Sequence, residues 1–392
     1  MRSWLPVPWN CNMENARRWS SKVLTGVMLC LAHPVFAQLD NDAISDKIAI
    51  AEKDSNSWGI TVSNFNYQRN TEYFNKIESG RTLFGYQLHP SIFMQPTAQI
   101  RLQLGVFAQS DFGATPVYNK VLPTFSAKFL NKRRTESFTF GTLEGALAHG
   151  LIEPLWDINS AIERRIENGV QFRSERKSMF ADVWINWEKF IERGSPYKEQ
   201  FTAGFNVSPV LFKTTNHFFL SLPIQGTAFH RGGQIDIDSS NLVMQFNSAV
   251  GMCFGRANAG RLFNTWKLEG YFTAYSENSN SGYFPYRSGN GIFLNASVGI
   301  SNFTALVSYW NGNQWIAPRG TTLYQSVSLD NPAVLEKSRE LVFVRFLYNK
   351  TINKHFAIAA RLEPVYDVKA QLLDFSYSLY ISYKFSKTIS KL

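Results

Sequence analysis

The sequence predicts an all-β protein: a transmembrane, antiparallel, up-and-down β-barrel of about sixteen strands, with a range of fourteen to eighteen. Three observations predict this fold. Between Trp58 and Phe385 the dominant hydrophobic period is two, which is the period of a strand. The connections between the alternating segments are short and long in turn. After residue 37, no uninterrupted apolar run approaches the roughly 20 residues that a membrane helix needs.

Residues 1–37 have the pattern of an export signal peptide. Arg17, Arg18 and Lys22 precede the apolar core VLTGVMLCLA, and the segment ends in a small-residue cleavage pattern at Ala37. The alternative, an uncleaved membrane anchor, requires a longer apolar core. Cleavage leaves Cys253 as the one cysteine, so the exported chain cannot form an internal disulfide. We expect residues 38–57 to be a polar, loosely ordered periplasmic leader and residues 58–392 to be the barrel.

The alternation is clearest in AQIRLQLGVFA, residues 98–108, where Leu102 and Leu104 share one face and Arg101 and Gln103 share the other. Most of the segments approach or exceed the roughly 9 to 11 residues that a tilted strand needs to cross a bilayer. The predicted strands cover approximately residues 59–68, 81–94, 98–109, 119–130, 136–146, 168–174, 178–190, 199–212, 217–230, 242–254, 261–276, 289–299, 303–311, 339–349, 355–366 and 375–385.

The connections carry an independent indication. Short ones such as QPT, NKRRT and KTINK alternate with longer ones near residues 69–80, 147–167 and 312–338. A soluble β-sandwich has no reason to keep this alternation, whereas a membrane barrel has short periplasmic turns and long external loops.

The formal net charge is +10, and residues 1–37 contribute four basic residues and one acidic residue, which leaves +7 for the exported chain. This charge suits anionic partners but is too diffuse to indicate nucleic-acid binding. No cofactor-binding motif is present, so no cofactor is expected.

In these features the chain resembles a Gram-negative outer-membrane β-barrel of the porin type. The final strand FSYSLYISYKF is similar to the aromatic-terminated strand that such proteins present to the barrel-assembly machinery, although SKTISKL follows Phe385 here. The segment LIEPLWDINSAIERRIENGVQF resembles porin-like proteins of Bacteroidota. The resemblance implies a location in the cell outer membrane, contact with its lipid and lipopolysaccharide, and passage of small hydrophilic solutes. The resemblance is compatible with both a monomer and a homo-oligomer.

If each strand keeps its register, the polar parity faces the lumen. The predicted pore-lining basic residues are Arg101, Lys128, Arg173, Lys267, Arg345 and Arg361, joined by Lys384, against the acidic residues Asp182, Glu188, Glu269 and Glu363. This excess of basic residues predicts a mild anion preference in conduction. The alternative is that these charges pair across the wall and only solvate the interior.

The third long connection, residues 147–167, is the most informative loop. Ser160 and Glu163 have capping-box spacing, so a short amphipathic helix is expected to begin near Asn159. Resemblance to sixteen-stranded porins implies that this loop folds inward and narrows the pore. Its cationic filter would then be Arg164 and Arg165, with Glu153, Asp157 and Glu163 as the opposing acidic candidates. The alternative is an external cap on neighbouring loops.

The sequence predicts neither a metal site nor enzymatic activity. His149, Glu153 and Asp157 are spaced four apart, but Pro154 interrupts the helix that would align them. A barrel lipase needs a nucleophile, a histidine and an orienting polar residue. No nucleophile motif accompanies the candidate histidines His89, His217, His230 and His355.

Five tryptophans, Trp58, Trp184, Trp187, Trp310 and Trp315, fall near predicted strand ends or loops. An interfacial girdle is the first interpretation, and platforms for sugar stacking are the alternative. Three functional hypotheses follow. They are a passive diffusion channel for anionic or neutral solutes; a closed or plugged barrel for adhesion, assembly or secretion; and a membrane-embedded hydrolase.

Overall fold

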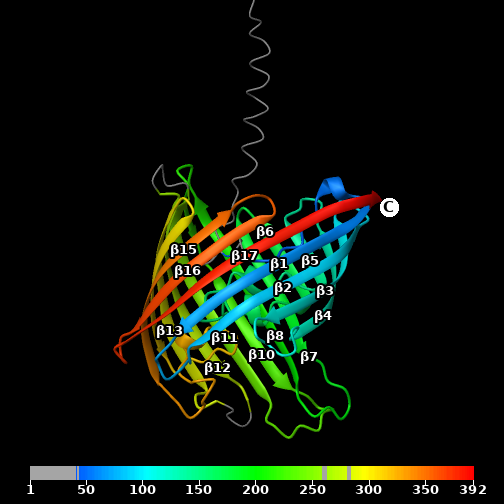
Figure 1. The fold of residues 1–392 in the computed structure, drawn as a ribbon. Coiled ribbons are helices and arrows are strands. Elements are labelled where there is room, and N and C mark those ends of the chain that lie inside the picture. Colours follow the sequence, from blue (N-terminus) through cyan, green and yellow to red (C-terminus); the bar gives the residue numbers. More distant parts are fainter. Residues whose placement is uncertain (1–40, 42–43, 258–262, 280–283) are drawn as a thin grey trace, which may run out of the picture. The chain divides into compact units, whose positions relative to one another are not determined.

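The computed structural model describes residue 41 and residues 44–257, 263–279 and 284–392, so the predicted signal peptide lies outside the described residues. One antiparallel sheet closes on itself (Figure 1). Its strands are β1 (Ser57–Glu72), β2 (Arg81–Gln95), β3 (Ile100–Asp111), β4 (Lys120–Leu130), β5 (Glu136–Thr142), β6 (Asn168–Arg176), β7 (Met179–Lys189), β8 (Glu199–Lys213), β9 (Phe218–Ser221), β10 (Ile224–Gly232), β11 (Val243–Ala257), β12 (Thr265–Glu277), β13 (Ser288–Ile300), β14 (Phe303–Asn313), β15 (Ser338–Thr351), β16 (Phe356–Asp367) and β17 (Leu372–Lys391). The short helical segments are η2 (Glu52–Asp54), η3 (Ala146–His149), α2 (Ser160–Glu163) and η4 (Thr322–Tyr324).

β9 and β10 are two parts of one barrel strand. Both pair with β8 on one side and with β11 on the other. Leu222 and Pro223 separate them, and a proline has no N–H group with which to continue the ladder. The described residues therefore form a barrel of sixteen strands, which confirms the predicted fold and strand number.

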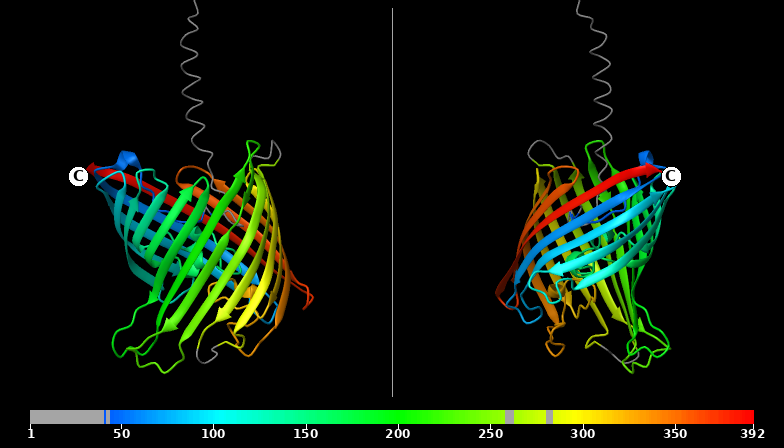
Figure 2. Two further views of the ribbon diagram at one scale, coloured as in Figure 1. Left: turned by 180° about the vertical axis from the view of Figure 1, so that it is seen from behind. Right: turned by 45° about the vertical axis from the view of Figure 1, so that its right-hand side comes forward.

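The barrel closes where β1 meets β17, and the two strands run side by side in Figures 1 and 2. Their register extends from Ser57 opposite Lys391 to Glu72 opposite Phe375. The residues after Phe385 thus continue the closing strand to Lys391.

The two faces of the wall differ in chemistry as the alternation predicted. On the outer face Leu104 and Ile92 are 63% and 57% exposed, whereas on the lumen side Arg101 and Gln87 are 4% and 2% exposed. A closed ladder with an apolar outer face is the arrangement that a bilayer accepts, which places the protein in the outer membrane. None of the helices in the described residues is long and apolar enough to cross a membrane.

The connections confirm the predicted alternation. Short turns such as 96–99, 131–135 and 352–355 lie at one end, which we call the short-turn end, and β1 begins and β17 ends there. Long loops such as 73–80, 143–167 and 314–337 lie at the other end. In a membrane barrel the short-turn end faces the periplasm.

Loops 143–167 and 314–337 fold into the lumen. Ile152 and Leu155 of the first loop pack in one buried cluster with Trp315 and Tyr324 of the second and with Trp310 of β14. The interfacial-girdle interpretation is therefore wrong for three tryptophans, Trp184, Trp310 and Trp315, because their rings face inward and are covered by these loops. Trp58 and Trp187 lie exposed on the outer face.

A buried ion-pair network joins both loops to the wall. The Arg345 guanidinium lies 2.6 Å from the Glu153 carboxylate and 3.2 Å from that of Glu363. Tyr324 donates a hydrogen bond of 2.8 Å to Glu153, and Arg69 lies 2.8 Å from Glu363. Because every carboxylate in this network has a cation, the network can be stable in the lumen.

His149 anchors loop 143–167 from the other side. Its Nδ1 lies 2.9 Å from Asp182 and its Nε2 lies 3.0 Å from Glu167, and the ring stacks on Trp184 with centroids 3.6 Å apart. Both ring nitrogens must donate, so the side chain is an imidazolium. Burial opposes the charged form, but Glu167 and Asp182 outweigh it and raise the pKa of His149 to about 9.

The described part of the predicted leader also contacts the inner wall. Side chains of the barrel and of loop 143–167 donate to its carbonyls: Arg165 to Ile44 at 3.0 Å, Lys128 to Ile48 at 3.1 Å, and Gln95 to Ala51 at 2.6 Å. Ile44 is buried beside Phe65 and Tyr380. These contacts hold residues 44–56 in place, in contrast to the loosely ordered segment that the sequence predicted.

Replacing Arg345 with methionine should destabilise the barrel by about 3 to 5 kcal/mol, because the buried Glu153 carboxylate loses its ion pair with Arg345. The measurement is the free energy of unfolding by urea, followed by tryptophan fluorescence. Adding Glu153→Gln should recover part of the loss, since it removes that charge. If the changes in unfolding free energy of the two single variants simply added in the double variant, Arg345 and Glu153 would not be coupled.

Raising the pH should weaken the His149 anchor. The folded pKa of about 9 lies above the ordinary value of about 6.5, so the stabilisation is complete below the ordinary value and is lost as pH rises through the folded one. The difference in unfolding free energy between the wild type and His149→Gln should therefore shrink above about pH 9. A difference that stays constant from pH 6 to pH 10 would argue against an imidazolium.

Candidate functional site

A cavity of about 400 Å³ lies between the leader, loop 143–167 and the inner face of β1 to β4. Its apolar lining includes Ile48, Phe65, Phe107, Leu143 and Ile166. Its polar lining includes His89, Gln87, Gln103 and Ser126. The cavity thus combines an apolar side with a titratable side chain.

His89 of β2 contacts a hydroxyl of β4 across the intervening strand. Its Nε2 lies 2.8 Å from Thr124 Oγ1. Gly105 of β3 is the register partner of both Ser91 and Thr124. A Cβ at Gly105 would lie 2.6 Å from Ser91 Oγ, so the glycine keeps this part of the lumen face free of a side chain. The imidazole can accept the hydroxyl proton when Nδ1 carries its own proton.

Asp46 of the leader lies in the same region and interacts electrostatically with His89. Burial favours the neutral form of Asp46, but Lys384 and Arg165 lower the pKa of the carboxyl below its usual value. Both cations lie 3.9 Å from its carboxylate oxygens. The carboxylate is therefore ionised at neutral pH.

Among the histidines in the described part of the chain, His89 is the one that hydrogen-bonds to a hydroxyl. His149 is held by two carboxylates, and His355 Nδ1 contacts the Lys384 carbonyl at 2.8 Å. His230 stacks on Phe201, with centroids 4.8 Å apart. The arrangement of a base beside a hydroxyl therefore singles out His89 and Thr124.

The predicted pore-lining residues lie in different surroundings. Arg101 lines the cavity. Lys128 lies 2.5 Å from Glu144, and Arg173 lies 2.9 Å from Glu175. Arg345 belongs to the ion-pair network, Arg361 donates to Asn41 at 2.5 Å, and Lys267 lies half-buried on β12.

The predicted constriction residues are also distributed. Glu153 and Asp157 are buried, Glu163 lies 2.5 Å from Arg81, and Arg164 is half-buried. Arg165 lines the cavity and lies over the Phe65 ring, 4.6 Å from its centroid. The expected helix near Asn159 is the single turn α2, and Asn159 makes no side-chain capping hydrogen bond.

Sequence reasoning missed the pairing of His89 with Thr124 and the position of Asp46. The alternation places His89 and Thr124 on the polar faces of their segments, and this could be predicted from the sequence. Their contact depends on the register across three strands, which alternation does not fix.

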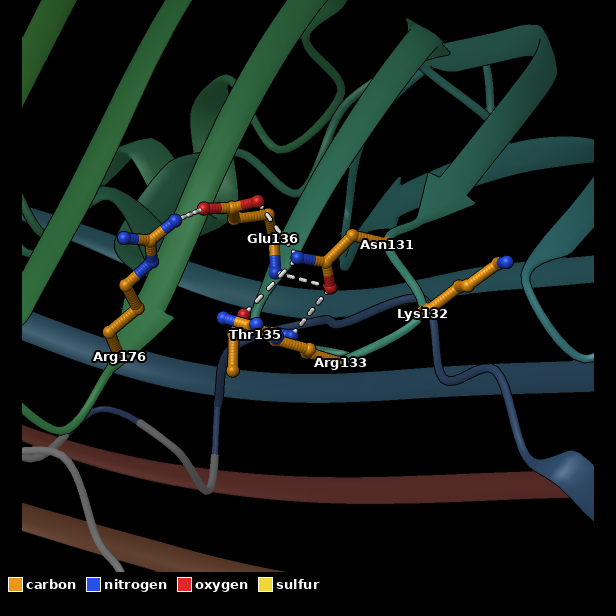
Figure 3. Close-up of a pocket in the computed structure, with 6 residues that line it drawn as sticks. All are labelled: Asn131, Lys132, Arg133, Thr135, Glu136 and Arg176. Carbon is orange, nitrogen blue, oxygen red and sulfur yellow. Dashed lines mark hydrogen bonds and ion pairs between the residues drawn. The ribbon is translucent and has the colours of Figure 1, made fainter.

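A second hollow of about 440 Å³ lies at the turn between β4 and β5 (Figure 3). Asn131 Oδ1 accepts from the Thr135 and Glu136 backbone N–H groups at 2.9 and 3.3 Å, and Arg176 pairs with Glu136. Lys132 points away from the turn. These contacts stabilise the turn and offer no acid–base pair. In the described ranges, no three His, Cys, Asp or Glu residues are grouped to hold a metal ion.

Solved structures with a similar fold include the outer membrane protein OprD from Pseudomonas aeruginosa, at 9% identity, 90% coverage of this chain, 98% of that chain and a TM-score of 0.49. The loop L8 deletion mutant of OmpT from Vibrio cholerae has 9% identity, covers 84% of this chain and 99% of that chain, and has a TM-score of 0.48. OccAB4 from Acinetobacter baumannii has 11% identity, and the match covers 85% of this chain and 99% of that chain with a TM-score of 0.47.

No curated protein matches the chain. The model of one family, described as lipid A 3'-O-deacylase-type, matches residues 50–392. A deacylase is an enzyme, so this match overturns the prediction that the protein has no enzymatic activity. The matched range includes the whole barrel and the last residues of the leader. The chain belongs to the lipid A 3'-O-deacylase-type family.

Proposed function

We propose that the protein hydrolyses an acyl ester of a membrane lipid, with lipid A as the first candidate substrate, and that His89 and Thr124 carry the chemistry. The observation that carries the proposal is the 2.8 Å contact between Thr124 Oγ1 and Nε2 of His89, a residue that lines the cavity. Family membership supports ester hydrolysis as the reaction class.

In the proposed reaction His89 Nε2 takes the proton of the Thr124 hydroxyl while Oγ1 attacks the ester carbonyl. The tetrahedral intermediate collapses, the bond to the alcohol oxygen breaks, and His89 returns the proton to that oxygen. His89 then deprotonates a water molecule, which attacks the acyl-threonine ester; the bond to Oγ1 breaks, the fatty acid is released, and His89 returns the proton to Thr124 Oγ1. Asp46 favours the imidazolium that forms in each half of the reaction.

The apolar side of the cavity suits the acyl group. Phe65 and Phe107 are 2% and 3% exposed, so part of an acyl chain would leave water among rings that are already buried. Ile48 supplies the leader's contribution to this side. The cavity volume lies within the usual range for small-molecule sites.

Substituting His89→Gln should lower the rate of fatty-acid release from purified lipid A by about 10²- to 10⁴-fold, the usual contribution of a positioned base. Thr124→Val should abolish release, and Thr124→Ser should retain part of it. His230→Gln, on the outer wall, serves as the matched control and should keep full activity. Heat-shifted gel mobility verifies that each variant folds. Full activity in folded His89→Gln would rule out the proposed base.

An anion-preferring diffusion channel is the second candidate, because Arg101 and Arg165 line the same cavity. Arg164 and Arg165 would be its filter, and Lys128, Arg173, Lys267, Arg345 and Arg361 would contribute further lumen charge. The loops and leader that pack in the lumen favour the hydrolase over the channel.

Planar-bilayer recordings separate the two candidates. A hydrolase with a filled lumen should give no stepwise conductance, whereas a channel should give steps. Conductance steps whose anion preference falls after Arg164 and Arg165 are neutralised would establish the channel.

A further inference from the structure

We propose that the cavity contains a phosphate-binding site that is open to the periplasm, with Arg101 as the principal contact for an anionic group that enters from the short-turn end. The binding site does not require that ester cleavage occur. It therefore goes beyond the proposed reaction.

The described lining of the cavity is strongly basic. Six basic residues contribute to it: Lys47, Lys53, Arg101, Arg165, Lys354 and Lys384. Asp46 is the one carboxylate among the described lining residues, and Arg165 and Lys384 already flank it. A concave site with this balance of charge concentrates anions.

Arg101 differs from most of the buried arginines of the barrel wall, although among the described residues Arg361 also has no carboxylate within ion-pair distance and donates to Asn41 instead. Arg69, Arg173 and Arg345 each lie within ion-pair distance of a carboxylate. Arg101 is 4% exposed, yet in the described structure no carboxylate lies within 4 Å of it, and Asp54 acts on it only from farther away. A buried cation without a close counter-ion is costly, so the site favours a ligand that supplies one.

The guanidinium of Arg101 is also positioned for a ligand. It stacks 3.7 Å from the centroid of the Phe93 ring, and its Nε makes one long hydrogen bond of 3.4 Å to Gln103. No protein hydrogen bond engages its two Nη groups among the described residues. A planar guanidinium with two free nitrogens matches the oxygens of a phosphate group.

The position of the exposed lining residues gives the direction of entry. Lys47, Lys53 and Lys354 are exposed, and Lys354 belongs to the 352–355 turn at the short-turn end. Gln87, Phe107 and Thr142 form buried parts of the lining. Since short turns face the periplasm, a ligand reaches Arg101 from that side.

The shared chemistry is a phosphate group, and two sources can carry it: a soluble phosphate compound or the headgroup of an acidic lipid. Isothermal titration of the detergent-purified full-length protein distinguishes them. One arm uses inorganic phosphate, a second uses dihexanoyl phosphatidylglycerol, and a third uses dihexanoyl phosphatidylcholine, whose headgroup carries no net charge.

Binding in the first or second arm, and at least tenfold weaker binding in the third, would support the site. Binding of inorganic phosphate would identify a soluble source as sufficient, and binding of phosphatidylglycerol alone would identify a lipid headgroup. Arg101→Gln should weaken binding by about 10- to 100-fold, the usual value of a hydrogen bond to a charged group. Arg101→Lys keeps the charge but lacks the planar pair of guanidinium N–H donors, so it should weaken binding less than Arg101→Gln does.

Arg133→Gln changes an exposed arginine of the 131–135 turn and is the matched control, with unchanged binding expected. Inorganic phosphate contains no ester bond, so its binding separates this proposal from the hydrolysis. No binding in any arm, or equal affinity in the wild type and in both folded Arg101 variants, would overturn the site.

Discussion

The structure depends on one constraint: in a bilayer, every backbone N–H and C=O group of a spanning strand must find a partner within the sheet. The pairing of β1 with β17 along their full register meets this constraint and removes both edges of the sheet. Once the sheet is closed, alternation alone assigns each residue either to lipid or to the lumen. The lumen is then the one place where charged side chains can gather.

Because the lumen carries charged side chains, the loops and the leader can bind inside it and fill the interior. Arg345, which is itself paired with Glu363, holds Glu153 of loop 143–167, and Asp182 of β7 holds His149 of the same loop. The leader occupies a further part of the interior, because its carbonyls accept from wall cations. What remains between these segments is the cavity that contains His89.

Much of the fold was readable from the sequence because the period of two and the alternating connections are properties of single segments. The candidate site was less readable, because it depends on contacts between segments. Thr124 meets His89 only through the register of three strands, and Trp310 is buried because distant loops cover it. Enzymatic activity was missed because the sequence contains no nucleophile motif, and a hydroxyl on a barrel strand carries no local signature.

The central claim is that Thr124 Oγ1, activated by His89, attacks an acyl ester inside a closed barrel. The most direct measurement is peptide mass spectrometry of the protein after brief exposure to an activated acyl ester such as p-nitrophenyl butyrate. The account predicts a butyryl adduct on Thr124 that is absent in the His89→Gln variant. An adduct on another residue, or turnover that proceeds with no adduct on Thr124, would contradict it.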